Sequence, residues 1–306
     1  MTEPLRICYV GNSMTFYNDL PHLVETILAP NLLEGGMEIA ACLRGGRSLK
    51  TIWEQGADMA RANACIGNKG MVETVEQLFD APSGWDVIVL NDFTQHPARP
   101  ECREESLNIL KDRYIPAINA MAGRSGKTPL TLFYSTWGYA APAKKSEEIG
   151  DFKLMSRKLA GGIFSYAALF QDSGLRAGIV EVGAAAEAVH DRDKDLWASL
   201  YQPDNFHPKP LGSFLIACVF AATITRHPVL SHRFSGCRIN PAWPEHIQCC
   251  GPVVADDPDY FKNLDSLPED AASRVTPPTQ DAIAAVLRTV GGFMSDGESA
   301  EKKSRI

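Results

Sequence analysis

The stretch YVGNSMTFYNDLP, residues 9–21, joins the end of an apolar run to the start of a helical pattern. The run, LRICYV over 5–10, is mostly apolar and does not alternate, which is typical of a parallel strand that is covered on both faces. Gly11, Asn12 and Ser13 follow it directly. Because ligands of open parallel sheets bind beyond the carboxyl ends of the strands, this stretch raises a choice between turn chemistry and a nucleophilic serine.

Similar apolar runs recur along the chain, and helical patterns separate them. The further predicted strands are residues 37–43, 85–91, 129–135 and 177–183. The predicted helices are residues 19–29, 48–64, 71–79, 104–122, 146–172 and 211–225. Asp19 is expected to be the N-cap of the first helix. This alternation predicts a doubly wound α/β fold, a three-layer α/β/α sandwich around a central five-stranded parallel sheet.

Composition divides the chain into four segments. Residues 1–227 form the predicted core. Residues 228–278 are rich in Pro, Cys, Trp and Asp, and are expected to be an irregular excursion packed on the core that could serve as a lid. A C-terminal helix of the core is predicted over 279–292, and the charged end, 293–306, is predicted to be a flexible tail.

Charge and hydropathy restrict the partners of the chain. Its 306 residues carry a net charge of −7, from 30 Lys and Arg against 37 Asp and Glu, without a basic block. Nucleic acid and anionic membranes are therefore not expected as partners, whereas a small polar molecule is. The N-terminal sequence shows no signal-peptide pattern, and the longest apolar run, 214–225, is too short to span a bilayer. We therefore predict a cytoplasmic protein, and a homo-oligomer is one option that the sequence leaves open.

Neither the cysteines nor the histidines predict a metal site. The eight cysteines contain no pair of CxxC motifs, so we expect reduced thiols that pack as small apolar groups. Five histidines show no paired metal-ligand spacing and are interpreted as surface or core residues: His22, His190, His227, His232 and His246. No metal and no cofactor are therefore expected.

Polar side chains gather where the predicted strands end, and several of them suit nucleophilic catalysis. A serine hydroxyl is a weak nucleophile that needs a neighbouring base. His207 could take the proton of Ser13, and Asp204 could fix the imidazole tautomer and stabilise the imidazolium. The developing oxyanion needs preorganised donors, and the candidates are the backbone N–H groups of Ser13 and Gly46 and the side-chain amide of Asn91.

Four short blocks of the sequence resemble those of the SGNH hydrolases, also called GDSL-type lipases and esterases. The blocks are GNS at 11–13, GRS at 46–48, VLND at 89–92 and DNFHP at 204–208. Together with Gly212, which opens the last long predicted helix, they fall between residues 9 and 220. The resemblance implies a flavodoxin-like fold, with the strands of the sheet in flavodoxin-like order. It also implies a serine esterase in which the residues named above act as nucleophile, base, orienting acid and oxyanion donors.

The third block departs from the family pattern. Val89 occupies the position of the usual glycine, and a related subgroup has a Gln-Glu-x-Ser type of block there. Gln95 therefore competes with Asn91 as the amide donor. Four residues at or after strand ends are candidate substrate contacts: Asn12, Gln95, His96 and Trp137.

These features predict an enzyme that cleaves a small, acetyl-like acyl ester of a carbohydrate or another polar alcohol through an acyl-enzyme intermediate. The acyl group and the alcohol are inferred from the resemblance. One alternative is a flavodoxin-like module that binds an anion or a cofactor at the turn after the first strand. Another is a catalytically inactive relative that acts as a scaffold. The presence of Ser13, Asp204 and His207 favours the enzyme.

Overall fold

A parallel sheet organises the fold. The computed structural model describes residues 3–58, 70–141, 148–247, 249 and 277–288. The strands are β1 Leu5–Gly11, β2 Met37–Leu43, β3 Val87–Leu90, β4 Leu130–Ser135 and β5 Arg176–Glu181. All of them pair in parallel, in the order β2-β1-β3-β4-β5. This is the flavodoxin-like order that the sequence predicts.

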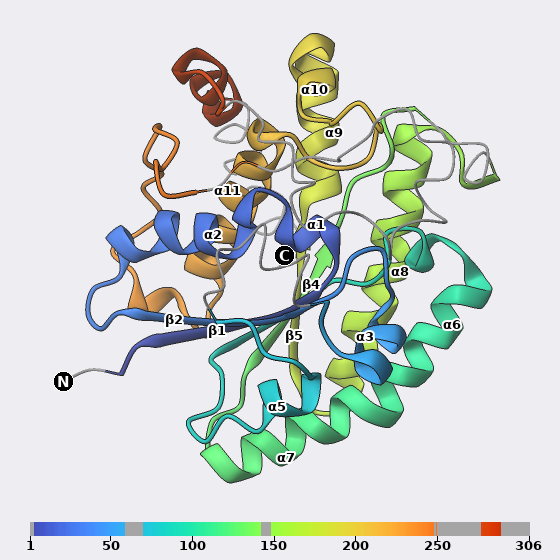
Figure 1. Ribbon diagram of the computed structural model, residues 1–306, viewed down its shortest axis with the longest axis vertical. Helices are drawn as coiled ribbons and strands as arrows, with labels where there is room; N and C mark the ends of the chain where they lie inside the picture. The colour runs from blue at the N-terminus through green and yellow to red at the C-terminus, as the bar shows by residue number, and fades with distance from the viewer. Residues whose placement is uncertain (1–2, 59–69, 142–147, 248, 250–276, 289–306) are drawn as a thin grey trace, which may run out of the picture.

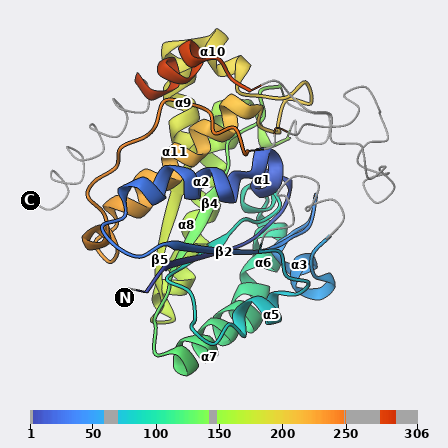
Figure 2. The same ribbon diagram turned by 60° about the vertical axis from the view of Figure 1, so that its left-hand side comes forward.

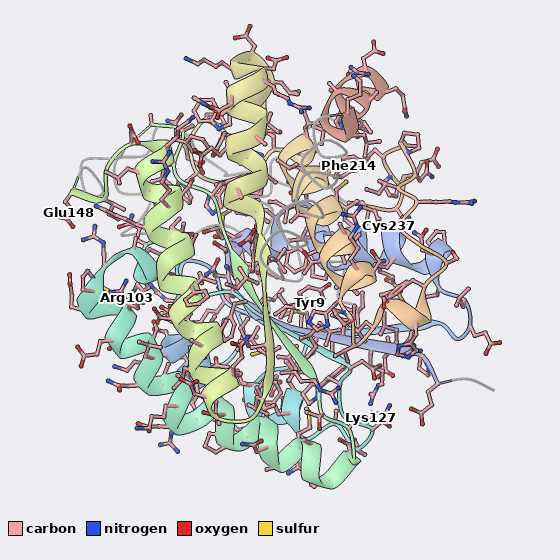
Figure 3. The ribbon with its side chains drawn as sticks, turned by 180° about the vertical axis from the view of Figure 1, so that it is seen from behind. Tyr9, Arg103, Lys127, Glu148, Phe214 and Cys237 are labelled. Carbon is pink, nitrogen blue, oxygen red and sulfur yellow. The ribbon has the colours of Figure 1, made fainter. Side chains whose placement is uncertain are left out.

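Helices cover both faces of the sheet (Figure 1, Figure 2). One face carries α2 Leu20–Leu28, α9 Val182–Arg192 and α11 Pro210–Arg226, and α10 Lys194–Ser199 follows α9. The other face carries α3 Leu49–Gln55, α5 Val75–Phe79, α6 Pro100–Ile109, α7 Ile115–Ser125 and α8 Phe152–Asp172. Figure 3 shows this arrangement from behind, with Arg103 on α6 and Phe214 on α11. The predicted three-layer sandwich is confirmed.

The first strand shows why its sequence does not alternate between apolar and polar residues. Leu5, Ile7 and Tyr9 belong to the apolar core under α2 and α11. Cys8 and Val10 belong to the core under the helices of the opposite face. Successive side chains of a strand point to opposite faces, so both sets are buried when helices cover both faces.

Several predicted helices differ from the observed ones for local reasons. The helix predicted over 48–64 ends at Gln55, before Gly56 with φ 70°, and the one predicted over 146–172 begins at Phe152, because the side chain of Asp151 caps it there. The helix predicted over 71–79 begins only at Val75, because the side chain of Thr74 caps it there. The single helix predicted over 104–122 is interrupted by a π-helical turn, Leu110–Tyr114, which separates α6 from α7.

Asp19 occupies the predicted N-cap position of α2, but its side chain does not cap the helix. Its backbone is left-handed, with φ 51° and ψ 49°, whereas a capping residue usually has an extended backbone. Asp19 Oδ1 lies 2.6 Å from Nδ1 of His22 instead. The prediction is therefore right about the position and wrong about the contact.

The chain after α11 is irregular where it is described. Residues 228–247 contain a 3-10 turn, Ser231–Arg233, and no other helix or strand is assigned within that range. They pack on the core through buried side chains of Leu230, Phe234 and Ile247. This part of the predicted excursion therefore contributes to the core.

A helix over 280–288 returns to the same core, with Ile283 and Val286 buried. Parts of other predicted segments lie outside the described residues: 59–64, 146–147, 250–276, which belong to the expected lid, and 289–306, which include the expected tail. None of the helices in the described ranges is long and apolar enough to cross a membrane.

Adjacent glycines in α8 offer a matched test of packing. A Cβ on Gly162 would overlap the carbonyl oxygen of Pro97, whereas a Cβ on Gly161 would meet no atom within 4 Å. We expect Gly161→Ala to raise the free energy of unfolding by about 0.5–1 kcal/mol, because alanine favours the helix. Gly162→Ala should lower it by about 1–3 kcal/mol, because the backbone must shift to admit the methyl group. Urea unfolding measures both changes, and equal effects would contradict this packing.

Candidate active site

Ser13 lies at the carboxyl end of β1, on the first residue of a short helix. This helix, α1, spans Ser13–Phe16, and Asn12 caps it by accepting the N–H of Met14 at 3.1 Å. Ser13 Oγ lies 2.7 Å from Nε2 of His207, a residue 194 positions later. The hydroxyl therefore has an imidazole partner, as a serine nucleophile requires.

A carboxylate holds the other side of the His207 ring. His207 Nδ1 lies 2.7 Å from Asp204 Oδ2, and Asp204 Oδ1 accepts the backbone N–H groups of Phe206 and His207 at 3.1 and 3.0 Å. Burial alone would raise the pKa of Asp204, but these hydrogen bonds and the attraction of His207 outweigh burial and lower it. Asp204 is thus an ionised carboxylate at neutral pH. It favours the proton on Nδ1, which leaves Nε2 as the acceptor toward Ser13.

Two aromatic rings enclose the imidazole. The ring centroids of Tyr17 and Phe206 lie 4.2 and 3.9 Å from that of His207. Trp137, predicted as a substrate contact, is instead fully buried, and its indole N–H donates to the Phe206 carbonyl at 2.9 Å. A Cβ on Gly212 would overlap the carbonyl oxygen of Leu200 and would lie 2.9 Å from the Trp137 ring, which explains a glycine at the start of α11. Trp137 therefore supports the loop that carries the histidine.

Gly11 is required because the ends of β1 and β3 approach closely. A Cβ on Gly11 would overlap Oγ1 of Thr15 and would lie 3.0 Å from Cβ of Asn91. The backbone N–H of Asn91 also donates to the Val10 carbonyl at 2.9 Å. The missing side chain of Gly11 thus allows Asn91 to lie beside the turn that carries the serine.

The predicted oxyanion donors come from neighbouring strand ends. Ser13 N–H is in the first turn of α1, where helical N–H groups have no intrahelical acceptor, and Gly46 lies in the turn after β2 with φ 64°. Thr15 Oγ1 donates to Oδ1 of Asn91 at 3.2 Å, which orients the amide and leaves Nδ2 as its donor. Within the described ranges, no hydrogen-bond acceptor is found for Ser13 N–H, Gly46 N–H or Asn91 Nδ2.

Asn12 was predicted to contact a substrate, but its side chain connects three strand ends instead. Its Nδ2 donates to the carbonyl oxygens of Arg47 and Asp92 at 3.2 and 2.9 Å, and its Oδ1 accepts the N–H of Met14. The residue is 2% exposed. The amide is therefore hydrogen-bonded to the backbone of the turns after β1, β2 and β3.

Asp92, which is not among the predicted site residues, is a buried carboxylate. It accepts four hydrogen bonds, from Leu49 N–H at 3.0 Å, Phe93 N–H at 2.8 Å, Ser106 Oγ at 2.6 Å and Tyr166 O–H at 3.0 Å. These contacts join α3, α6 and α8 to the residue that follows Asn91. The only signal in the sequence is the place of Asp92 in the third block, since its partners on α3, α6 and α8 are distant along the chain.

Gln95 and His96 are half-buried and bonded to other side chains. Gln95 Nε2 donates to Tyr139 Oη at 3.2 Å, and its Oε1 accepts from Arg99 at 2.9 and 3.1 Å. His96 Nδ1 lies 3.4 Å from Ser106 Oγ. The amide of Gln95 is thus oriented by Tyr139 and Arg99. Among the residues with described side chains, no group of three or more His, Cys, Asp or Glu could hold a metal ion.

Comparison with known proteins supports the fold. No family model matches the chain, and no curated protein matches its sequence. A DUF4886 family protein from Bacteroides uniformis is 18% identical and superposes with a TM-score of 0.55, over 88% of this chain and 98% of its own. A lipase from a goat rumen metagenome is 12% identical, with a TM-score of 0.44 over 71% and 96%, a similarity too low to carry a functional conclusion. The chain therefore shares with the Bacteroides protein a fold built on a five-stranded parallel sheet with helices on both faces.

The lowered pKa of Asp204 predicts how stability depends on pH. Such a carboxylate stabilises the folded state above its unfolded pKa of about 4, and this contribution is lost as the pH falls through the folded pKa. We expect the difference in unfolding free energy between wild type and Asp204→Asn to be largest above about pH 5 and to shrink below about pH 4. Guanidinium unfolding from neutral to acidic pH measures it. A difference that does not change with pH would contradict an ionised, hydrogen-bonded Asp204.

Proposed function

We propose that the chain is a serine ester hydrolase that acts through an acyl-enzyme intermediate. The observation that carries this proposal is a pair of 2.7 Å contacts, from Ser13 Oγ to His207 Nε2 and from His207 Nδ1 to Asp204 Oδ2. Both lie at the carboxyl edge of a parallel sheet, where ligands of such folds bind. The same spatial arrangement of nucleophile, base and orienting carboxylate serves acyl transfer on unrelated folds.

The reaction has two halves that use the same groups. Ser13 Oγ attacks the acyl carbonyl carbon while His207 Nε2 takes the hydroxyl proton, and His207 then returns this proton to the departing alcohol oxygen. A water molecule next attacks the acyl carbon on Ser13 while His207 Nε2 takes one of its protons. The bond from Ser13 Oγ to the acyl carbon then breaks, His207 returns the proton to Ser13 Oγ, and the carboxylic acid leaves. Asp204 stays ionised and stabilises the imidazolium in both halves.

The oxyanion of each tetrahedral intermediate would be bound by Ser13 N–H, Gly46 N–H and Asn91 Nδ2. Support for Asn91 comes from the Thr15 hydroxyl, which holds the amide oxygen and leaves the amide nitrogen available. The rival amide of Gln95 is oriented by other side chains. Such donors act strongly because they need no reorganisation during the reaction.

The substrate class is inferred from the family resemblance and from charge. We infer a small, acetyl-like acyl group on a carbohydrate or another polar alcohol, and the net charge of −7 fits such a neutral partner better than nucleic acid. An anion-binding module or an inactive scaffold would not need an imidazole hydrogen-bonded to Ser13, so the contacts favour the enzyme. A cytoplasmic location and a homo-oligomer stay predictions from the sequence.

Replacement of Ser13 tests the proposal directly. We expect wild type to hydrolyse p-nitrophenyl acetate and to be labelled by a fluorophosphonate probe. Ser13→Ala should lower kcat by at least about 10⁴-fold and abolish labelling, because the nucleophile is lost. Ser165→Ala, which removes a hydroxyl from the outer face of α8, should behave as wild type. Turnover and labelling that survive in Ser13→Ala would exclude this mechanism.

Paired variants separate the two candidate amide donors. Asn91→Ala should lower kcat by about 10²–10³-fold, which is the usual effect of losing one oxyanion donor. Gln95→Ala should change kcat little, because its amide bonds Tyr139 and Arg99. Steady-state kinetics of both variants with p-nitrophenyl acetate measure the contrast. The reverse order of effects would assign the donor to Gln95.

A further inference from the structure

The turn between α1 and α2 has an unusual backbone. Asn18 has φ 54° and ψ 31°, and Asp19 has φ 51° and ψ 49°, so two consecutive residues with side chains adopt the left-handed conformation. Residues other than glycine seldom adopt it, although Asn and Asp tolerate it better than most. Such conformations persist where the surrounding structure determines them, and they often occur at functional sites.

The side chain of Asn18 shows what the turn achieves. Asn18 is fully buried, and its Nδ2 donates to the carbonyl oxygen of Pro208 at 3.1 Å and to Oγ of Ser213 at 2.9 Å. Pro208 directly follows His207, and Ser213 lies in the first turns of α11. One amide thus connects the segment of the serine to the segment of the histidine, 190 residues away.

Further contacts hold the chain segments on both sides of this amide. Gln202 Nε2 donates to the Pro208 carbonyl at 3.3 Å, and Gln202 N–H donates to the His207 carbonyl at 2.8 Å. On the other side, the ring of Tyr17 lies against His207, and Tyr17 N–H donates to the carbonyl of Ser13. The chain from Ser13 to the Asn18 amide is therefore short and hydrogen-bonded, and it ends on the loop that carries the base.

We propose that Asn18 is a positioning residue that clamps the His207 loop to α1 and thereby sets the 2.7 Å distance between Ser13 Oγ and His207 Nε2. This inference rests on the proposed function of the triad. Asn18 takes no part in the chemistry. Its loss lets the imidazole move relative to the serine, which slows acylation while substrate binding is little affected, because small displacements of reacting groups strongly reduce the rate.

Two substitutions separate the amide from the backbone. Asn18→Gly removes the amide, and glycine adopts φ 54° without strain. Asn18→Asp keeps the shape of the side chain but replaces the donating Nδ2 with a carboxylate oxygen, which cannot donate to the Pro208 carbonyl. The matched control is Asn31→Gly, because Asn31 is also buried and its Nδ2 donates to the carbonyls of Ile27 and Arg238 at 2.7 and 2.9 Å, in contacts outside the triad and its loops.

The kinetics of p-nitrophenyl acetate hydrolysis test the clamp, at a temperature where circular dichroism shows each variant folded. We expect Asn18→Gly and Asn18→Asp to lower kcat by about 10–100-fold with KM nearly unchanged. Asn31→Gly should lower the unfolding temperature and leave kcat at the wild-type value. The inference is overturned if Asn18→Gly keeps the wild-type kcat, or if Asn31→Gly lowers kcat as much.

A double-mutant cycle measures whether the effects of Asn18→Gly and His207→Ala on kcat depend on each other, which a general loss of stability would not cause. In a His207→Ala background the base is gone, so adding Asn18→Gly should cause no further loss of kcat. An equal fold-loss in both backgrounds would overturn the clamp. If wild type neither hydrolyses p-nitrophenyl acetate nor is labelled by the fluorophosphonate probe, both the proposed function and the clamp are rejected. If wild type is active and Asn18→Gly has the same kcat, only the clamp is rejected.

Discussion

The hydrogen bond between Ser13 and His207 joins residues 194 positions apart. Closing so long a loop costs conformational entropy, so one hydrogen bond of modest net energy cannot hold the two segments together by itself. The sheet places the serine at the end of β1, and the packing of α11 beside α2 brings the histidine loop over it (Figure 1). The chemistry of the site therefore depends on the apolar core beneath it.

Buried polar side chains then refine what the core brings together. Asn12 connects the turns after three strands, Asp92 joins three helices to the third strand end, and Asn18 connects the serine segment to the histidine loop. In a low-dielectric interior an unpaired amide or carboxylate is costly, so such groups favour the one arrangement that satisfies all of their hydrogen bonds. The predicted oxyanion donors differ, because they are left without an acceptor among the described residues.

Much of the fold and part of the candidate site could be predicted from the sequence. Apolar runs without alternation indicate strands covered on both faces, and their succession with helices indicates a parallel sheet between two helical layers. The strand order followed from the family resemblance, and the structure confirms it. Trp137 and Asn12 were expected at the substrate, yet Trp137 is fully buried and Asn12 is bonded to backbone. Both residues follow strand ends, as predicted. The direction in which each side chain points, however, depends on partners from elsewhere in the chain.

The sequence by itself determined the layers and the residue types able to perform acyl transfer, because hydrophobic pattern and motif spacing are local properties. Only the tertiary structure decided the 2.7 Å contacts of the triad, the role of Gly11 in admitting Asn91, and the amide link from Asn18 to Pro208. Each of these depends on distances between segments far apart in the chain. Such distances are set by the packing of helices on the sheet, which no short stretch of sequence contains.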